Sequence, residues 1–574
     1  MFLPATKEEM RSLGWDRLDV ILVTGDAYID SPFIGVAVIG KVLRNAGFRV
    51  GVIAQPGTDS DTDIRRLGEP ALFWGVTGGC VDSMVANYTA TGRRRKRDDY
   101  TPGGINNRRP DRAVIVYSNL IRRYFKSSRP IVLGGIEASL RRIAHYDAWS
   151  GKIRRSILFD ARGDYLLYGM AEHSVVELAR ALTEGKSPRE IRGLCYISRT
   201  APRDCLLLPS YAKAAADKNA FTEMFEIFYQ NNDPVTARPL AQRQDTRYLV
   251  QNPPAPYLSQ PELDAVYRLD YERDLHPRDR RRGAVKALET IRFALKTHRG
   301  CYGECGFCAI AAHEGRRVRW RSPASILAEA KEIARHPEFK GTLHDVGGPT
   351  ANMYGFECAR KATSGACRGK SCLFPEICPE LHITHAPQIA LLRSLRHVPG
   401  IKKVVVASGI RHDLVLADAR HGEAYLREVV RHHVSGQMKI APEHTEPHVL
   451  SLMRKPGADA LLAFARLFYR LTRKAGKKQF LTYYLIAAHP GCAPRHMVRL
   501  RAFFLENLRT LPKQIQVFTP TPSTYVTLMY WTERDPFTGK PLFVEKDVRG
   551  KERQKAVYLN GPKRRKINNL KGKI

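Results

Sequence analysis

Three cysteines at positions 301, 305 and 308 constrain this sequence more than any other feature. They stand in the stretch Cys301-Tyr-Gly-Glu-Cys305-Gly-Phe-Cys308, directly after an apolar run that predicts a strand over 290–296. Thiolates are the usual ligands of a cubane [4Fe-4S] cluster, and three of them on one loop leave the fourth iron open, as in a catalytic metal site. Zinc is the competing metal, but zinc sites usually divide their ligands between two separate knuckles. We therefore expect an iron–sulfur cluster with one exchangeable iron.

The use of cysteine in the whole chain supports a metal site. The chain has 11 cysteines in 574 residues, and seven of them lie between Cys301 and Cys378. The N-terminal segment has charges of both signs and no apolar h-region, which argues against a signal peptide. No apolar run approaches the roughly 18 residues that a membrane helix needs. We expect a cytoplasmic protein without a membrane partner, in which clustered thiols bind metal more often than they form disulfides.

A second group of cysteines follows the first. Its members are Cys358, Cys367, Cys372 and Cys378, in a loop rich in Lys, Arg, Ser and Gly. Because such a loop has little apolar surface to bury, we expect a metal or a crosslink to hold its shape. An auxiliary Fe–S cluster or a zinc ion is favoured over free thiols, and disulfides come last. The spacing does not choose between iron and zinc.

The first third of the chain alternates short apolar runs with helical patterns. An apolar run at 20–23, a glycine-containing turn, a helical pattern over 34–46 and a second run at 49–53 follow the order of a βαβ unit, and similar runs recur at 71–77, 129–135 and 165–169. We expect residues 1–198 to form an N-terminal doubly wound, Rossmann-like α/β domain with a ligand crevice at the carboxyl ends of its strands. Tight turns explain each of its glycine-rich loops more readily than a ligand does, although three such loops on one edge favour a crevice.

The remaining two thirds divide into a connector, a second domain and a tail. Residues 199–285 are polar and rich in Pro and Arg, and we expect a connector with short helices. Between 286 and 540, six strand-then-helix repeats predict a full or partial (β/α) barrel with its chemistry on the loops after the strands, interrupted by the cysteine-rich insertion at 355–385. We expect residues 541–574 to form a mobile basic tail.

Charge gives a weaker indication of the partner. The chain has 93 Lys and Arg against 57 Asp and Glu, a formal net charge of +36. This bias favours RNA or an anionic metabolite as the partner, although a solvated basic surface explains it about equally well.

The cysteine spacing, with Phe307 before the last cysteine, is the radical S-adenosylmethionine (radical SAM) motif. The surrounding sequence resembles the YgiQ-type radical SAM proteins, the UPF0313 family, in segments 15–28, 134–142, 347–354 and 439–445. The resemblance covers nearly the whole chain. Many relatives have a longer basic C-terminal region.

The resemblance implies an enzyme whose cluster passes one electron to S-adenosylmethionine, which is cleaved to methionine and a 5′-deoxyadenosyl radical that abstracts a substrate hydrogen. It implies an electron donor such as flavodoxin or ferredoxin. By position, the cluster ligands are Cys301, Cys305 and Cys308, and the cofactor-binding residues are Phe307 near the adenine, Gly347 and Gly348 at the methionine amino group, and Glu443 near the ribose. Pro349 stands where other radical SAM proteins often have an acidic residue, which leaves Asp345 as a weak substitute.

The first domain resembles the cobalamin-binding-type module that precedes many radical SAM barrels. Neither Asp26 nor Asp30 is followed by the His and Gly of a cobalamin ligand motif, so we do not expect bound cobalamin. His412, His444 and Tyr484 are candidates for the substrate side of the barrel. The competing hypothesis is a non-catalytic iron–sulfur protein that binds nucleic acid through its basic surface. The substrate itself is not predicted.

Overall fold

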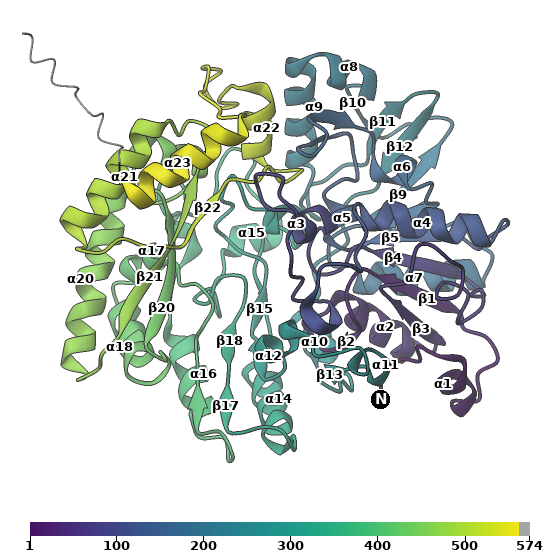
Figure 1. Cartoon of the computed structure of the whole chain (residues 1–574), viewed down its shortest axis with the longest axis horizontal. Coiled ribbons are helices and arrows are strands. Elements are labelled where there is room, and N and C mark those ends of the chain that lie inside the picture. Colours follow the sequence, from purple (N-terminus) through teal and green to yellow (C-terminus); the bar gives the residue numbers. More distant parts are fainter. Residues whose placement is uncertain (562–574) are drawn as a thin grey trace, which may run out of the picture.

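Two α/β modules lie side by side in the computed structural model, which describes residues 1–561 (Figure 1). The first module is built on a nine-stranded sheet with the order β10-β11-β12-β9-β8-β5-β4-β1-β3. Its strands are β1 (Val20–Thr24), β3 (Val50–Ala54), β4 (Phe73–Thr77), β5 (Ile131–Gly134), β8 (Tyr165–Leu167), β9 (Leu194–Ser198), β10 (Leu206–Leu208), β11 (Leu240–Gln244) and β12 (Arg247–Gln251).

The five strands from β3 to β8 run parallel and have helices on both faces. Every residue of β1 and β3 is buried, which explains why these strands appear in the sequence as unbroken apolar runs. One face of the sheet packs on α2 (Gly35–Asn45) and α7 (Glu172–Thr183), and the other packs on α4 (Ala113–Tyr124). This arrangement confirms the predicted doubly wound domain.

Residues 199–285, which we expected to be a connector, contribute β10, β11 and β12 to this sheet. Buried glutamines conceal the strand pattern, because their side chains bind backbone groups and charged groups inside the module. Gln242 Oε1 accepts a hydrogen bond from the Ala144 N–H, and Gln251 Oε1 accepts one from Arg142 Nε. The sequence therefore looks polar where the structure has a sheet, and the connector expectation is wrong for these strands.

The second module is a partial barrel of parallel strands. Its strands are β14 (Ala294–Lys296), β17 (Thr342–Leu343), β18 (Asp345–Gly347), β19 (Lys403–Val404), β20 (Gln437–Glu443), β21 (Phe480–Ala487) and β22 (Ile515–Val517). Pairing runs from β14 to β18, from β17 to β19, through a bridge between Ile410 and Ile440, and then from β20 to β21 to β22. Within residues 1–561 no pairing joins β22 back to β14. Helices that follow these strands are α14 (Pro323–Arg335), α16 (Ala386–Arg396), α18 (Gly422–His432), α20 (Ala458–Lys474) and α21 (Pro494–Asn507).

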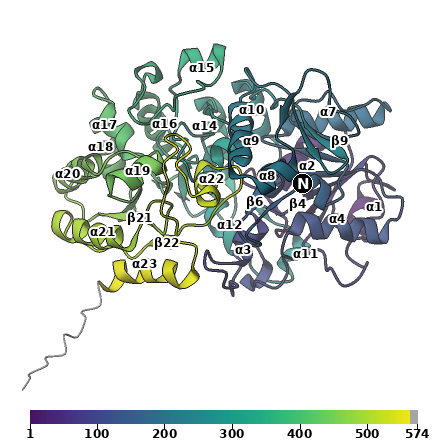
Figure 2. The same ribbon diagram turned by 90° about the horizontal axis from the view of Figure 1, so that it is seen from above.

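The chain end returns to both modules. Helix α22 (Tyr525–Thr532) packs against α9 (Lys218–Gln230) of the first module, as Figures 1 and 2 show, and the Trp531 ring stacks on the Tyr146 ring at 5.0 Å. Residues Val548–Asn560, which we expected to belong to a mobile tail, form α23 with Gln554 and Tyr558 buried. The basic residues from 562 onward lie outside the described residues.

Two further features concern the module boundary and the membrane. A buried ion pair between Arg299 and Glu172 joins the barrel to the first module. Between residues 1 and 561, no helix combines the length and the apolar character that crossing a membrane requires.

Candidate metal centre

The three predicted ligand cysteines lie on the loop between β15 (His298–Arg299) and α13 (Ile310–His313). A Cβ added at Gly303 would lie 3.3 Å from Cys301 Sγ and 3.5 Å from Cys305 Sγ, so both sulfurs lie against the same point of the loop. The Gly303 N–H donates to Cys301 Sγ at 3.3 Å. Burial, followed by the neighbouring Cys305, raises the pKa of Cys301 and raises that of Cys308 to about 12. Three thiols that share one buried site can all become thiolates only if a cation compensates them, which is what a metal cluster supplies.

Arg411 adds a fixed positive charge to this site. Its Nη1 lies 3.6 Å from Cys305 Sγ, its Nε donates to Asp413 Oδ1 at 2.8 Å, and its backbone N–H donates to Asn352 Oδ1 at 2.8 Å. The side chain is buried, so this geometry is held on three sides. The sequence pass missed Arg411, because it stands far along the chain in the loop after β19.

The glycines at the end of β18 differ in what they can offer a ligand. The Gly347 carbonyl accepts the Thr297 N–H at 2.8 Å, whereas within residues 1–561 the Gly348 carbonyl accepts no hydrogen bond. A Cβ at Gly348 would lie 2.6 Å from Nε2 of the His298 ring. Asp345, the weak substitute for the missing acidic residue, accepts bonds from the backbone N–H groups of Ala407 and Ser408. Only Gly348 therefore keeps a group available for an amine.

Glu443 is strained, buried and close to the cysteines. Its φ is 68°, at an irregularity of the β20–β21 pairing, and its Oε2 has no partner among the described residues. Burial raises the pKa of Glu443, while Lys455 and Arg411 oppose that rise, and Glu443 in turn raises the pKa of Cys308. A strained residue with an unsatisfied carboxylate oxygen is typical of a ligand-binding position.

Phe307 lies on the other side of the loop, between the two modules. Its partly buried ring packs on the cores of both modules and meets the His489 ring edge-on at 6.5 Å. His489 Nε2 is buried without a partner in the described chain, and burial lowers the pKa of His489 to about 4. This histidine lies beside the aromatic residue that the resemblance assigns to the adenine.

The cysteine-rich insertion is tied to the cluster loop by Lys361. The Lys361 backbone N–H donates to Cys358 Sγ at 3.4 Å, and its Nζ lies 3.3 Å from Cys372 Sγ and 3.4 Å from Glu304 Oε1. Glu304 stands between Cys301 and Cys305 in the sequence, so the insertion packs directly on the cluster loop. The Cys378 N–H donates to the Cys372 carbonyl at 2.9 Å.

The four cysteines of the insertion do not meet as ligands of one ion. In the described part of the chain, the set of three metal-ligand side chains close enough to share an ion is Glu446, His448 and His496, and it contains no cysteine. Arg495 Nε donates to His496 Nε2, and Arg499 pairs with Glu446, so that set is already occupied. A second cysteine site with Cys358, Cys367, Cys372 and Cys378 stays a prediction.

The three substrate-side candidates have structural partners. His412 packs on Phe464 in the barrel core, and burial lowers its pKa to about 4. His444 Nδ1 accepts the Thr445 N–H at 2.9 Å, and the Tyr484 hydroxyl accepts from Gln516 Nε2 at 2.6 Å. The structure does not bring these three residues together.

Comparisons with known proteins agree with this geometry. Residues 2–294 match the family model described as Radical SAM N-terminal. The UPF0313 protein FN0734 of Fusobacterium nucleatum is 55% identical over 98% of this chain and 100% of its own length. A UPF0313 protein of Thermotoga maritima is 49% identical over 97% of this chain and 98% of its own.

Among solved structures, the chain is similar to TsrM, a radical S-adenosylmethionine methyltransferase from Kitasatospora setae. That structure, which has cobalamin and a [4Fe-4S] cluster bound, is 15% identical, with a TM-score of 0.50, and the match covers 88% of this chain and 76% of that chain. At this identity the likeness shows the shared fold.

Proposed function

Because this chain belongs to the UPF0313 family of radical SAM proteins, we propose that it cleaves S-adenosylmethionine reductively and directs the resulting 5′-deoxyadenosyl radical at a substrate. The observation that supports this most strongly is the convergence of Cys301, Cys305 and Cys308 at one buried site beside Arg411. These thiols would hold a [4Fe-4S] cluster, which supplies the single electron that breaks the bond between sulfur and C5′ and leaves methionine and a carbon radical.

The residues around the cysteines have distinct roles in this proposal. The Gly348 carbonyl accepts a hydrogen bond from the methionine amine, since the Gly347 carbonyl is already used. The unsatisfied Glu443 carboxylate accepts from the ribose hydroxyls. Phe307 contacts the adenine, and Arg411 compensates the charge of the thiolates.

The other cofactors follow from the same proposal. A flavodoxin or ferredoxin returns the electron after each turnover. An auxiliary Fe–S cluster or zinc ion holds the insertion through its four cysteines. The expected absence of cobalamin is unconfirmed, because TsrM, which shares the fold, has cobalamin bound. Residues 25–34, which follow β1, contain no histidine, and we propose no cobalamin-dependent step.

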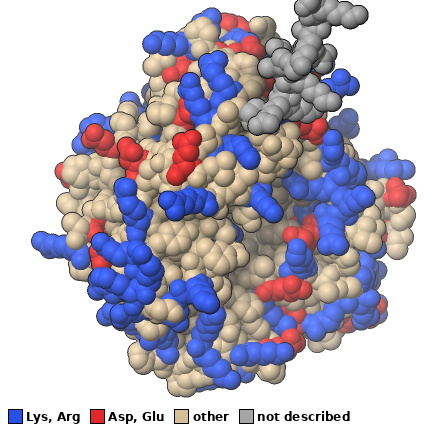
Figure 3. Space-filling view, turned by 60° about the vertical axis from the view of Figure 1, so that its left-hand side comes forward, with Lys and Arg blue, Asp and Glu red and all other residues tan. Residues whose placement is uncertain are grey.

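RNA is the substrate class that the charge favours. Lys and Arg side chains cover much of the face shown in Figure 3 and outnumber the acidic residues there. Such a surface attracts a phosphate backbone in a salt-dependent way.

The test is formation of 5′-deoxyadenosine. Anaerobically reconstituted, reduced protein incubated with S-adenosylmethionine should release it, and Cys305→Ala should abolish the product. Cys195→Ala, at a buried cysteine of the first module, is the matched control and should leave the product unchanged. If cluster-loaded protein binds RNA but never forms 5′-deoxyadenosine, the protein is a non-catalytic iron–sulfur protein and the proposal is wrong.

A further inference from the structure

A cavity of about 360 Å³ opens at the carboxyl edge of the parallel strands in the first module. The loops after β1, β4, β5 and β8 line it, and between β1 and β4 the order of the strands reverses. Such a reversal point is where open α/β sheets bind ligands. The volume lies at the lower end of the range of small-molecule pockets.

The body of the cavity is an apolar slot. Its floor is the sheet, with Leu22, Phe73 and Leu167, and its roof is formed by α2 and α7, with Val38 and Val175. A slot between a sheet face and two helices fits a flat, apolar body better than a branched or charged one.

The far end of the cavity is polar and belongs partly to the second module. Glu172 pairs with Arg299 through Oε1, while its Oε2 is buried without a partner among residues 1–561. His313 Nδ1 is likewise buried and unpartnered in the described chain, and burial lowers the pKa of His313, so its ring is neutral at pH 7. These two atoms can serve one edge that both donates and accepts hydrogen bonds.

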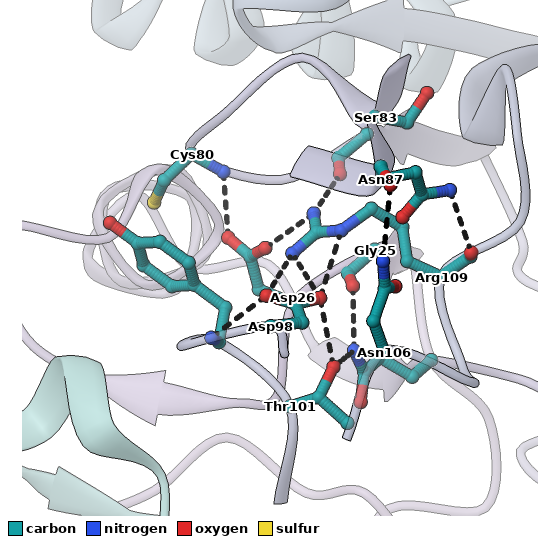
Figure 4. Close-up of polar contacts among 12 residues, drawn as sticks. Gly25, Asp26, Cys80, Ser83, Asn87, Asp98, Thr101, Asn106 and Arg109 are labelled. Carbon is teal, nitrogen blue, oxygen red and sulfur yellow. Dashed lines mark hydrogen bonds and ion pairs between the residues drawn. The ribbon is translucent and has the colours of Figure 1, made fainter. Parts of the chain in front are cut away.

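The loop after β1 disfavours a phosphate. Arg109 bridges two buried carboxylates, at 2.7 Å from Asp26 and 3.1 Å from Asp98, and the Cys80 N–H donates to Asp26 at 2.6 Å (Figure 4). In a dinucleotide-binding fold the backbone N–H groups at this position face a pyrophosphate. Here a carboxylate occupies that position and its cationic partner is shared, so the ligand is uncharged at this edge.

We propose that this cavity binds a planar nitrogen heterocycle of the nucleobase or benzimidazole class. Its ring lies between the sheet and helices α2 and α7, and its N–H and ring nitrogen meet Glu172 Oε2 and His313 Nδ1. Because α13, which ends at His313, begins two residues after Cys308, the bound ring lies behind the cluster loop. The site is separate from that of S-adenosylmethionine and does not depend on its cleavage.

The test measures benzimidazole binding to the full-length reconstituted protein by calorimetry, with S-adenosylmethionine at saturation. Indole is the matched probe, since it has the N–H donor but no ring-nitrogen acceptor, and it should bind about tenfold more weakly. His313→Phe should weaken benzimidazole about tenfold and remove the difference from indole. Val175→Phe fills the slot and should weaken both probes. His173→Phe, at a half-exposed neighbour on α7, should change neither.

Two further probes separate the sources of such a ring. Tighter binding of adenosine than of benzimidazole identifies a free nucleoside, and tighter binding of aquacobalamin identifies the base-bearing tail of a corrinoid; either result supports the site. The proposal is overturned if neither benzimidazole nor adenosine binds, or if binding survives both His313→Phe and Val175→Phe. If His313→Phe alone does not fold, as its melting temperature shows, Val175→Phe decides.

Discussion

Arg411 should set the reduction potential of the cluster, because it is a buried cation in contact with a ligand sulfur. Its Nη1 lies 3.6 Å from Cys305 Sγ. Positive charge near an iron–sulfur cluster favours the reduced state, which has one more electron. Replacing Arg411 by Met keeps an unbranched side chain and removes the charge, so the midpoint potential should fall.

The size of the shift follows from the geometry. At an effective dielectric constant of about 20, a unit charge at 3.6 Å contributes about 5 kcal/mol, or about 200 mV for one electron. Asp413, on the far side of the guanidinium, cancels roughly half of this in the native protein. Arg411→Met alone leaves Asp413 unpaired and should lower the potential by up to about 200 mV, whereas Arg411→Met with Asp413→Asn should lower it by about 90 mV. Both values are upper limits, because the added electron is shared among the irons.

The assay is an anaerobic redox titration of the reconstituted proteins followed by electron paramagnetic resonance. Iron and sulfide counts establish that each variant holds a full cluster, so a change of potential is not confused with loss of the cluster. Arg411→Lys retains the charge and should stay close to the wild-type potential. A shift below about 20 mV in Arg411→Met, or an equal shift in Arg411→Lys, would refute the electrostatic reasoning.

Three other outcomes are expected. Gly348→Ala places a Cβ 2.6 Å from the His298 ring and should weaken S-adenosylmethionine binding about tenfold by calorimetry, whereas Gly347→Ala, whose Cβ has ordinary contacts from 3.4 Å, should change it by less than about threefold. Burial lowers the pKa of His412 to about 4, so below pH 6.5 the unfolded chain takes up a proton that the folded chain refuses, and stability falls with pH; chemical denaturation at pH 7.5 and 5.5 should show that His412→Phe removes about 1 kcal/mol of this loss, and an unchanged pH dependence would contradict it. In a variant with all three cluster cysteines replaced, metal analysis should still find iron or zinc, which Cys372→Ala should remove; no metal in the first variant would mean free thiols in the insertion.

The parts of the fold that the sequence predicted are those with unmixed patterns. β1 and β3 are buried on both faces, so their apolar runs are unbroken and the βαβ order is plain. β11 and β12 escaped prediction because their glutamines satisfy buried polar groups from other parts of the module, a function that no periodicity shows. α23 escaped for a related reason, since its burial rests on few side chains in a basic segment.

The site divides in the same way. Cys301, Cys305 and Cys308 act through spacing along one loop, which a sequence displays directly. Arg411 reaches Cys305 only because the loops after β18 and β19 are neighbours in the barrel, and Asp345 is taken by Ser408 across the same two loops. Contacts of this kind depend on which strands pair, and the cysteine spacing has no information about that pairing.

The position of α22 has a consequence for how the protein matures in the cell. Its Val526 N–H donates to the Gly306 carbonyl at 2.9 Å, inside the cluster loop, while Trp531 in the same helix stacks on Tyr146 of the first module. A ribosome completes the cluster loop long before it makes this helix, so the loop leaves the exit tunnel without the segment that fastens it. The nascent chain must therefore wait until translation is nearly finished before its thiols have their final surroundings, and an assembly factor would deliver iron and sulfide to a released or almost released chain. Truncation before residue 525 should yield a protein that loses its iron on purification, even though every ligand cysteine is present.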